Sequence, residues 1–410
     1  RGHPGQWYTF TTLRIQDRGL MASPYDHIDA EWLADQTLAL VETPSVTMDE
    51  AQVCTQFADL MSDIGLEADV REVTPGRNNL YARIPGTGGG PTLMYNGHLD
   101  TIPIGDCIPP ERDGNTISGR GSTDMKGGMV AMVGMAKALL ESGTSLKGDL
   151  WLTAVVGHEE PVADKDGPKA LIEDLNSERI QADRICIVEG RDALWVMSMG
   201  SMVWTVRFTS PQGGTHTQYV PFDDNPIRYV GDLIRRIQER QAEMDGGDVH
   251  PLAGADRIDV GIVNAGDYFN RTPVVCELTG TRRWAPGRTA KTCLSELDIL
   301  ASTVAGGSGL DVEVSMVHER EPFETPIYDE AVQAFAEAHK KVTGEDVEYV
   351  GMRIVGDANL YVHGTEIPTF YYGPCNETAH SDAETVSVER IAGATKVYTA
   401  AAMEYCGVAS

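Results

Sequence analysis

Tyr95-Asn96-Gly97-His98-Leu99-Asp100 closes a short apolar run, Thr92-Leu93-Met94-Tyr95, that is typical of a buried strand. Open α/β sheets bind their ligands at the carboxyl ends of strands, which is where His98 and Asp100 stand. Side chains two residues apart on an extended segment point the same way. The Asp100 carboxylate can therefore accept the proton of one imidazole nitrogen and leave the other free for a metal ion. The alternative is a surface histidine without a ligand.

A second decisive stretch is Gly119-Arg120-Gly121-Ser122-Thr123-Asp124-Met125-Lys126-Gly127-Gly128. It is a glycine-rich turn that leads into an apolar helical run over 129–140. A carboxylate held in such a turn can bridge two cations. The alternative is that Asp124 only caps the helix, because Asp is favoured at that position.

The composition bounds the class of protein. A chain of 410 residues predicts two domains, and a formal net charge of -28 argues against nucleic acid or an anionic membrane as a partner. The seven cysteines are scattered and include no CxxC, which favours a reducing cytoplasm. We find no apolar run long enough to span a membrane and no signal peptide. Residues 1–20 are treated as an N-terminal extension without an assigned function.

Hydrophobic periodicity predicts an α/β protein with a second, inserted domain. Helices are expected over 29–43, 48–65, 129–140, 169–175, 225–244, 294–305, 329–342 and 387–405. Strands are expected over 67–73, 79–84, 92–95, 149–157, 185–188, 197–210, 257–265, 272–283, 310–318 and 369–372. The first and last parts, 21–194 and 321–410, alternate strands with helices and should form one discontinuous metal-binding catalytic domain. Between them, the order strand, helix, strand, strand, helix, strand predicts a small α+β lid domain over 195–320.

Potential ligands follow several predicted strands. His98, the Glu159-Glu160 pair and Glu189 each stand directly after a buried strand, so they should meet at one edge of the sheet. The candidate metal ligands are His98, Asp124, Glu160, Glu189 and His380. Two imidazoles and three carboxylates suit a pair of Zn²⁺ ions, with Mn²⁺ or Co²⁺ as alternatives. Two metal ions about 3.5–4 Å apart need a bridging carboxylate, for which Asp124 is the candidate.

Glu159 and Glu160 are adjacent, so they cannot both point at one metal ion from an extended backbone. We predict that Glu160 binds metal, while Glu159 takes the proton of the attacking water and delivers it to the leaving nitrogen. The alternative is that both glutamates form the solvated, acidic start of a helix.

Further candidates fall in the predicted lid. His216, within Gly213-Gly214-Thr215-His216-Thr217, is either a hydrogen-bond donor to a developing oxyanion or a structural turn histidine. Arg282 and Arg283 either neutralise a substrate carboxylate or face solvent. Asn270 in the lid and Arg353 beyond it are weaker substrate-binding candidates of the same kind.

The ordered set Gly-His-Leu-Asp, Gly-Arg-Gly-Ser-Thr-Asp-Met-Lys-Gly-Gly, Glu-Glu after a strand, Val-Glu-Gly and a late His resembles one known family. This is the co-catalytic zinc metallopeptidase family of aminoacylases, glutamate carboxypeptidases, acetylornithine deacetylases and succinyl-diaminopimelate desuccinylases. The resemblance covers roughly 29–405. It implies a zinc-peptidase-like catalytic domain with two divalent metal ions per subunit and a ferredoxin-like lid that usually dimerises. It also implies that His216 reaches the active site of the partner subunit.

The chain departs from the family pattern around the substrate. Gly-Gly-Thr-His-Thr-Gln surrounds His216 in place of the commoner Gly-x-x-x-His-Ser-Ser. The usual Asn-x-x-Pro block is present only loosely, as Asn270-Arg271-Thr272-Pro273, and the usual Gly-Pro-Gly is replaced by Gly373-Pro374-Cys375. These differences lie where substrate is held rather than where metal is held, so the resemblance does not name a substrate.

The sequence therefore predicts a cytoplasmic dinuclear metal-dependent hydrolase, forming a homodimer or higher homo-oligomer through its lid. Its substrate would be a small carboxylate-bearing molecule, such as an N-acyl amino acid or a dipeptide, cleaved at an amide-type or amine C–N bond. One alternative is an aminohydrolase that removes an aromatic amine, as in nitroanthranilate deamination. A non-catalytic ligand-binding relative would lack a metal ligand, and none is missing. A phosphoesterase would need a phosphate-binding glycine loop or a basic cluster beside the ligands, and neither is clear.

Overall fold

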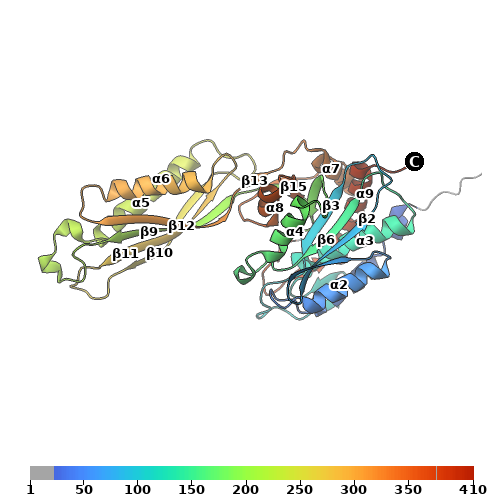
Figure 1. Cartoon of the computed structure of the whole chain (residues 1–410), viewed down its shortest axis with the longest axis horizontal. Coiled ribbons are helices and arrows are strands. Elements are labelled where there is room, and N and C mark those ends of the chain that lie inside the picture. Colours follow the sequence, from blue (N-terminus) through green and yellow to red (C-terminus); the bar gives the residue numbers. More distant parts are fainter. Residues whose placement is uncertain (1–22, 375) are drawn as a thin grey trace, which may run out of the picture.

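A computed structural model describes residues 23–374 and 376–410, so the predicted N-terminal extension lies outside the described residues. The described chain forms two bodies, a larger one at the right of Figure 1 and a long, narrow one at the left. The larger body is built from the first and last parts of the sequence, and the narrow body from the middle part, which we call the lid.

A nine-stranded sheet organises the larger body, with strand order β1-β2-β6-β3-β7-β15-β8-β13 and β14 paired to β8. Strand β3 is parallel to β6 on one side and to β7 on the other, so the carboxyl ends of these three strands lie at one edge. The nine strands are β1 (Asp69–Thr74), β2 (Arg77–Ile84), β3 (Leu93–His98), β6 (Leu150–Val155), β7 (Arg184–Ile187), β8 (Leu194–Ser198), β13 (Phe323–Glu324), β14 (Tyr349–Met352) and β15 (Thr369–Tyr371).

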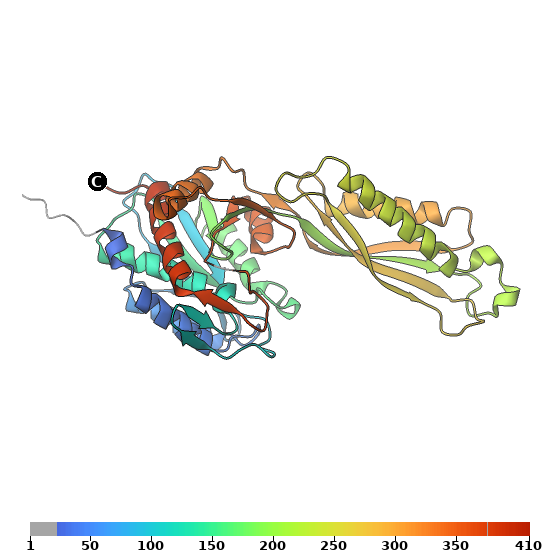
Figure 2. The ribbon, with the colours of Figure 1, turned by 180° about the vertical axis from the view of Figure 1, so that it is seen from behind.

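Helices cover both faces of this sheet. Helices α4 and α8 pack together in front of it in Figure 1, whereas α3 and α9 lie in front of it in the reverse view of Figure 2. Helices α1 and α7 pack against α9. The helices of this body are α1 (Ala30–Glu42), α2 (Ala51–Asp63), α3 (Gly127–Glu141), α4 (Asp166–Asn176), α7 (Glu330–Thr343), α8 (Asp357–Thr365) and α9 (Val388–Cys406), with short turns η1 (Pro24–His27), η2 (Ser122–Lys126) and η3 (Pro161–Ala163).

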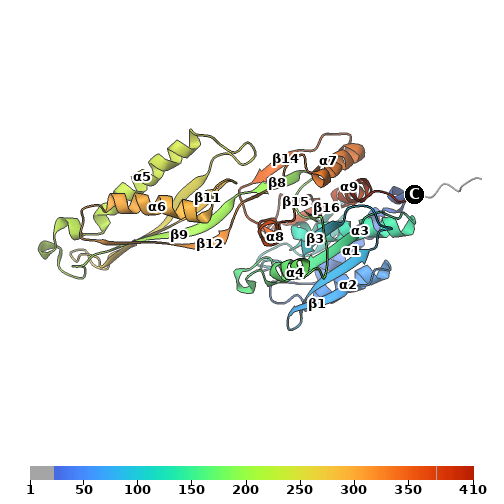
Figure 3. The same ribbon diagram turned by 45° about the horizontal axis from the view of Figure 1, so that its top comes forward.

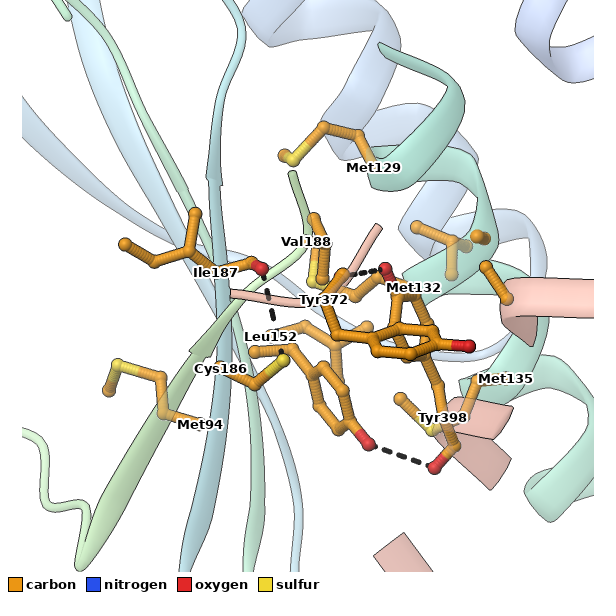
Figure 4. Packing of buried hydrophobic residues seen from close by; sticks show 14 of the residues in the cluster. Met94, Met129, Met132, Met135, Leu152, Cys186, Ile187, Val188, Tyr372 and Tyr398 are labelled. Carbon is orange, nitrogen blue, oxygen red and sulfur yellow. Dashed lines mark hydrogen bonds between the residues drawn. The ribbon is translucent and has the colours of Figure 1, made fainter. Parts of the chain in front are cut away.

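The main core lies between the sheet and helices α3 and α9. Figure 4 shows the methionines of α3, Met129, Met132 and Met135, beside Leu152 and Cys186 of the sheet. The Tyr398 hydroxyl of α9 donates a 2.6 Å hydrogen bond to the Tyr372 carbonyl, which ties the helix to the end of β15. Every residue of β3 is buried, as expected for a central parallel strand covered on both faces.

The lid has its own sheet and its own core. Its four antiparallel strands run in the order β10-β11-β9-β12, and two helices pack on the sheet (Figure 3). Trp204, Phe208 and Leu278 of the sheet pack with Leu233 and Leu297 of the helices. The lid elements are β9 (Gly200–Thr209), η4 (Thr217–Tyr219), η5 (Phe222–Asp224), α5 (Ile227–Asp245), β10 (Arg257–Ala265), β11 (Val275–Trp284), α6 (Ala290–Val304) and β12 (Asp311–Arg320). This is the predicted order of strands and helices for an inserted α+β lid.

One predicted strand is two strands in the structure. The segment 197–210 was expected to be continuous, but the chain leaves the large sheet after β8 and enters the lid sheet at β9. Between them the Met199 N–H donates to the Met352 carbonyl of β14 at 2.9 Å. The alternating apolar pattern continues through the break because each half buries one face in a different sheet.

A small three-stranded sheet was not predicted. It consists of β4 (Glu111–Asp113), β5 (Thr116–Ser118) and β16 (Thr385–Ser387), in the order β16-β5-β4. Strand β5 leads into the turn that carries Asp124, and β16 follows the loop that carries His380. The pairing of β5 with β16 therefore holds these two loops together.

The six described cysteines are all free. No helix within 23–374 or 376–410 has the length and apolar character needed to cross a membrane.

Candidate metal centre

The candidate ligands converge at the edge where β3, β6 and β7 end. His98 is the last residue of β3, Glu159 follows β6, and Glu189 follows β7. Asp124 joins them from turn η2, because α3 approaches the end of β7 very closely. A Cβ atom at Gly128 would lie 1.8 Å from the Val188 carbonyl oxygen, so only glycine allows this approach.

His98 is oriented with one ring nitrogen toward Asp124. Its Nε2 lies 3.1 Å from Asp124 Oδ1, and its Nδ1 lies 2.9 Å from the main-chain carbonyl of Asp100. The Asp100 carboxylate was predicted to accept the imidazole proton, but it is farther away, at 3.8 Å. The carbonyl takes that place, and it fixes the tautomer that leaves Nε2 free for a metal ion.

The Asp100 carboxylate instead holds the loop that carries the glutamate pair. It accepts hydrogen bonds from the main-chain N–H groups of His158 at 3.0 Å and Glu159 at 2.9 Å. The Thr47 hydroxyl donates a third hydrogen bond to it at 2.7 Å. The side chain of Asp100 is fully buried, so these bonds fix the direction in which the loop leaves β6.

His380 reaches the same cluster from the far end of the sequence. Its Nε2 lies 3.2 Å from Glu159 Oε2 and 3.3 Å from Asp124 Oδ2. One ligand atom from each of His98, Asp124 and Glu159 lies within 4.8 Å of the others. These four side chains therefore form one compact donor cluster.

The two adjacent glutamates take different positions in the structure. Glu159, predicted to move protons, lies within the cluster, whereas Glu160, predicted to bind metal, does not line the cavity at this centre. The main-chain N–H of Glu160 donates to the Thr47 hydroxyl at 3.3 Å. Glu189 lines the cavity together with Asp124 and His380. The structure thus brings together His98, Asp124, Glu159, Glu189 and His380.

Burial and neighbouring charges shift the pKa values of the clustered side chains in different directions. Burial opposes ionisation of Asp124, but hydrogen bonds with His380 and His98 outweigh it and hold the pKa of this carboxyl well below its usual range. Burial, followed by repulsion from Asp124, raises the pKa of Glu189 to about 7. Hydrogen bonding to Asp124 and Glu159 raises the pKa of His380 to about 10. The negative charge of the site favours bound cations, and in their absence it favours the protonated forms of His380 and Glu189.

These observations fit a site for divalent cations. Two imidazoles and three carboxylates are the donor types that zinc and manganese take, and the carboxylates crowd one another unless a cation lies between them. A bound cation would replace the proton on His380 and favour the ionised form of Glu189.

Several supporting residues were not found from the sequence. Glu384 accepts hydrogen bonds from the main-chain N–H groups of Thr123 and Asp124, both at 3.1 Å, and pairs with Arg120 at 2.7 Å. Lys126 Nζ donates to the carbonyls of Leu40 and Thr43, both at 2.9 Å, at the end of helix α1. Burial lowers the pKa of Lys126 to about 7. Only Arg120 and Lys126 carried a sequence signal, because they belong to the glycine-rich motif.

His158 and Asp357 form a second unpredicted pair beside the centre. The His158 ring stacks on the His98 ring, with 4.1 Å between centroids, and its Nδ1 lies 2.8 Å from Asp357 Oδ1. Burial opposes the charge on Asp357, but the attraction of His158 outweighs it and lowers the pKa of Asp357 to about 2. His158 thus has an ion-pair partner and supports the orientation of His98.

The lid candidates His216 and Asn270 meet each other rather than the metal centre. Asn270 Nδ2 lies 3.2 Å from His216 Nε2, although 54 residues separate them in the chain. Both lie near turn η4, at the end of the lid that is remote from the large sheet in Figure 1. Within one chain His216 cannot contact a substrate at the metal centre in this conformation.

The predicted arginines also lie away from the cluster. Arg282 is 1% exposed and pairs with Asp256 at 3.2 Å and Glu296 at 3.3 Å inside the lid. Arg283 lies 4.0 Å from the Glu319 carboxylate, and Arg353 donates to the Ala253 carbonyl at 3.0 Å. None of the three lines the cavity at the metal centre.

Comparison with known proteins gives a family match. Residues 94–404 match the profile of peptidase family M20/M25/M40. A succinyl-diaminopimelate desuccinylase of Cereibacter sphaeroides is 28% identical over 384 residues, which are 90% of this chain and 97% of that protein. Succinyl-diaminopimelate desuccinylase 2 of a Ruegeria species is 27% identical over 389 residues, 90% of this chain and 94% of that protein.

Solved structures share the fold. Aminopeptidase PepT from Bacillus cereus superposes with a TM-score of 0.77 at 20% identity, covering 92% of this chain and 99% of its own. The Bacillus subtilis YXEP protein, a dinuclear metal-binding peptidase, gives a TM-score of 0.70 at 17% identity, covering 91% of this chain and 97% of its own. These likenesses extend over both bodies of the described chain.

Proposed function

Because this chain belongs to peptidase family M20/M25/M40 and is a hydrolase acting on C–N bonds, we propose that it is a dinuclear metal enzyme for small carboxylate-bearing amides. The observation that carries the proposal is the donor cluster. His98, Asp124, Glu159, Glu189 and His380 come from five separate segments and meet at one cavity or within hydrogen-bond reach of it. A purely structural role would not require so many like charges in one place.

We propose that His98, Asp124, Glu189 and His380 would hold two divalent cations, Zn²⁺ by preference. Such cations, when bound, would supply Lewis-acid activation of the amide carbonyl and of the attacking water. The chain's own residues do the remaining work. The Asp100 carbonyl accepts the proton of His98 Nδ1 and so leaves Nε2 free for a cation. The Asp100 carboxylate accepts the main-chain N–H of Glu159 and so holds the loop that carries this residue.

Glu159 is the proposed proton carrier. Its carboxylate is 6% exposed and faces His380 and Asp124, which places it beside the reacting centre. It would accept a proton from the attacking water at a carboxylate oxygen and donate it to the leaving nitrogen. Glu160, the predicted fifth ligand, lies outside the cluster, and its role is decided by the experiment below.

We further propose a homodimer in which the His216–Asn270 pair serves the partner subunit. The pair is exposed at the remote end of the lid and has no access to its own metal centre. In the partner's site the His216 imidazole would donate a hydrogen bond to the developing oxyanion.

The test combines metal analysis with turnover. Purified protein should contain about two Zn²⁺ or Mn²⁺ ions per chain. Chelation should abolish hydrolysis of a panel of N-acyl amino acids, dipeptides and aromatic amines, and re-addition of the metal should restore it. Protein that binds no metal in excess Zn²⁺ contradicts the proposal.

Two matched variants then separate the roles of the glutamates. Glu159→Gln should keep both metal ions and lose turnover by about 10²–10⁴-fold, because the amide cannot accept a proton. Glu160→Gln should keep both metal ions if this carboxylate stays outside the cluster, and should lose one if metal binding draws it in. Near-normal turnover of Glu159→Gln contradicts the assigned proton transfer.

A further inference from the structure

Five consecutive main-chain N–H groups beyond the end of β6 donate to side chains rather than to a neighbouring strand. They belong to 156–160, the segment that ends at the glutamate pair. The donor–acceptor distances are 2.9–3.3 Å, and the four acceptor residues are between 0% and 7% exposed. The backbone that carries Glu159 is therefore held from inside the core. The acceptors are Asn79 for Val156, Glu50 for Gly157, Asp100 for His158 and Glu159, and Thr47 for Glu160.

Glu50 needs support of its own, because it is a buried carboxylate. It stands directly before helix α2, and its side chain is fully buried. Arg77 of β2 neutralises it with two hydrogen bonds, from Nε at 2.8 Å and from Nη2 at 2.9 Å. A carboxylate remains ionised in the core only when it is paired and hydrogen-bonded in this way. Its Oε1 also accepts the Gly157 N–H at 3.1 Å, so the ion pair reaches the loop directly.

Arg77 holds the same loop at its other end. Its Nη1 and Nη2 both donate to the carboxylate of Asp166, the first residue of α4, with 3.2 Å from Nη2 to Oδ1. Gly157 adopts a φ of +69°, and a Cβ atom there would lie 2.2 Å from Asp166 Oδ1 and 2.6 Å from Arg77 Nη2. Only glycine allows the two ends of the loop to meet this closely. The segment between Gly157 and Asp166, which carries Glu159, is thus closed by one guanidinium group.

We propose that Glu50 and Arg77 are positioning residues for Glu159. The inference rests on the proposed function, in which the Glu159 carboxylate carries the proton. Such a carboxylate must stay within about 2.6–3.2 Å of the group that it deprotonates, so a small shift of its backbone lowers the rate. Asp100 holds the N–H of Glu159 itself, whereas the Glu50–Arg77 pair fixes Gly157 before it and the far end of the loop. Neither residue of the pair lines the cavity at the metal centre, so both act through the backbone.

Glu50→Gln removes the charge and keeps the shape of the side chain. For the panel member that the enzyme hydrolyses best, we expect kcat to fall about 10–100-fold, with KM within about twofold and the metal content unchanged. Arg77→Lys keeps the positive charge and loses the two-point contact with Glu50, so kcat should fall in the same direction by a smaller factor. This second variant carries the test if Glu50→Gln does not fold.

Asp329→Asn is the matched control. Asp329 is a buried carboxylate directly before helix α7, as Glu50 is before α2, and it pairs with Arg184 at 2.7 Å. Arg184 is the first residue of β7, at the opposite end of that strand from the metal centre. The control variant should therefore lower Tm without changing kcat.

A double-mutant cycle distinguishes positioning from general destabilisation. In a Glu159→Gln background, the proton-accepting carboxylate that Glu50 positions is already gone. Adding Glu50→Gln should then change the remaining kcat by no more than about twofold. A loss of kcat by the same factor in both backgrounds overturns the proposal, because Glu50 would then act on something other than Glu159.

Hydrogen exchange reports on the loop without any turnover. In the Zn²⁺-loaded full chain, the amides of 156–160 should exchange about tenfold or more faster in Glu50→Gln than in the wild-type protein. Asp329→Asn should leave the exchange of these amides unchanged. A folded Glu50→Gln variant with wild-type exchange over 156–160 overturns the proposal.

The outcomes separate the two proposals. If Glu159→Gln turns over normally, the proposed proton transfer fails, and the positioning role falls with it. If Glu159→Gln is inactive while Glu50→Gln and Arg77→Lys both keep a normal kcat, the proposed function stands and the positioning role is overturned.

Discussion

The Glu384 carboxylate accepts a 3.1 Å hydrogen bond from the main-chain N–H of Asp124, across 260 residues of sequence. Glu384 follows His380 closely in the chain, so this bond couples the loops that carry two proposed metal ligands. Arg120, from the same motif as Asp124, neutralises the carboxylate at 2.7 Å. The arrangement fixes the backbone of the Asp124 turn before any cation arrives.

Replacing Glu384 should therefore weaken metal binding, although Glu384 is not itself a proposed metal ligand. We expect Glu384→Gln to lower zinc affinity about 10–100-fold, because supporting residues of this kind orient the ligands they contact. Competition with a chromogenic chelator measures the affinity. Glu67→Gln, at an exposed position remote from the motif, is the control and should leave it unchanged. Equal zinc affinities of the two variants would show that Glu384 does not support metal binding.

Asp100 should act on turnover through the Glu159 loop. Asp100→Asn keeps one acceptor oxygen but turns an amide N–H₂ toward one of the two main-chain N–H donors. The buried mismatch should cost about 1–3 kcal/mol and displace Glu159. We expect a lower kcat with both metal ions retained, measured by kinetics and metal analysis on the same sample. Loss of metal together with activity would instead make Asp100 part of the ligand support.

Gly128 should tolerate no side chain. The Cβ atom of alanine would meet the Val188 carbonyl at 1.8 Å, so α3 must move away from the end of β7. We expect Gly128→Ala to destabilise the fold by about 1–3 kcal/mol, seen as a lower Tm and as weaker metal binding. Gly393→Ala is the control, since nothing lies within 4 Å of a Cβ atom there. A Gly128→Ala variant with normal Tm would show that α3 can move away from Val188 without cost to stability.

Thiol chemistry should discriminate among the cysteines. Burial raises the pKa of Cys54 to about 12 and that of Cys406 to about 12, so their thiolate fractions stay very small at pH 8. Cys107 is only half-buried. Iodoacetamide at pH 8 followed by peptide mapping should modify Cys107 before Cys54 and Cys406, and should leave the latter two unmodified until the protein unfolds. Early labelling of Cys54 would contradict its packing.

Subunit complementation should test the lid proposal. Glu159→Gln inactivates its own site, whereas His216→Ala should inactivate the site of the partner. Mixed dimers of the two variants contain one intact site, so random exchange should restore about a quarter of wild-type activity. Each variant alone provides the baseline. No recovery in a mixture shown to exchange subunits would contradict action across the dimer, and full activity of His216→Ala alone would place His216 outside the reaction.

The sequence was enough to predict the elements that carry the metal centre. The apolar strands before His98, Glu159 and Glu189 and the motif around Asp124 have strong local patterns, because buried parallel strands need continuous apolar residues. The lid order of strands and helices followed from periodicity in the same way. These features depend on neighbours close in the chain, which a single sequence displays.

Tertiary structure decided which side chains meet. The contacts of Glu384 with Asp124 and of His158 with Asp357 join distant segments, and no local pattern marks them. The same holds for the different positions of Glu159 and Glu160, which depend on how Asp100 and Thr47 hold the loop after β6. Arg282 and Arg283 were candidates either for binding a substrate carboxylate or for facing solvent, and the carboxylates that lie beside them, Asp256 and Glu319, are known only once the chain has folded. Sequence determined the chemistry available at the site, and packing determined the use of each group, because hydrogen bonds and ion pairs act over a few ångströms of space rather than along the chain.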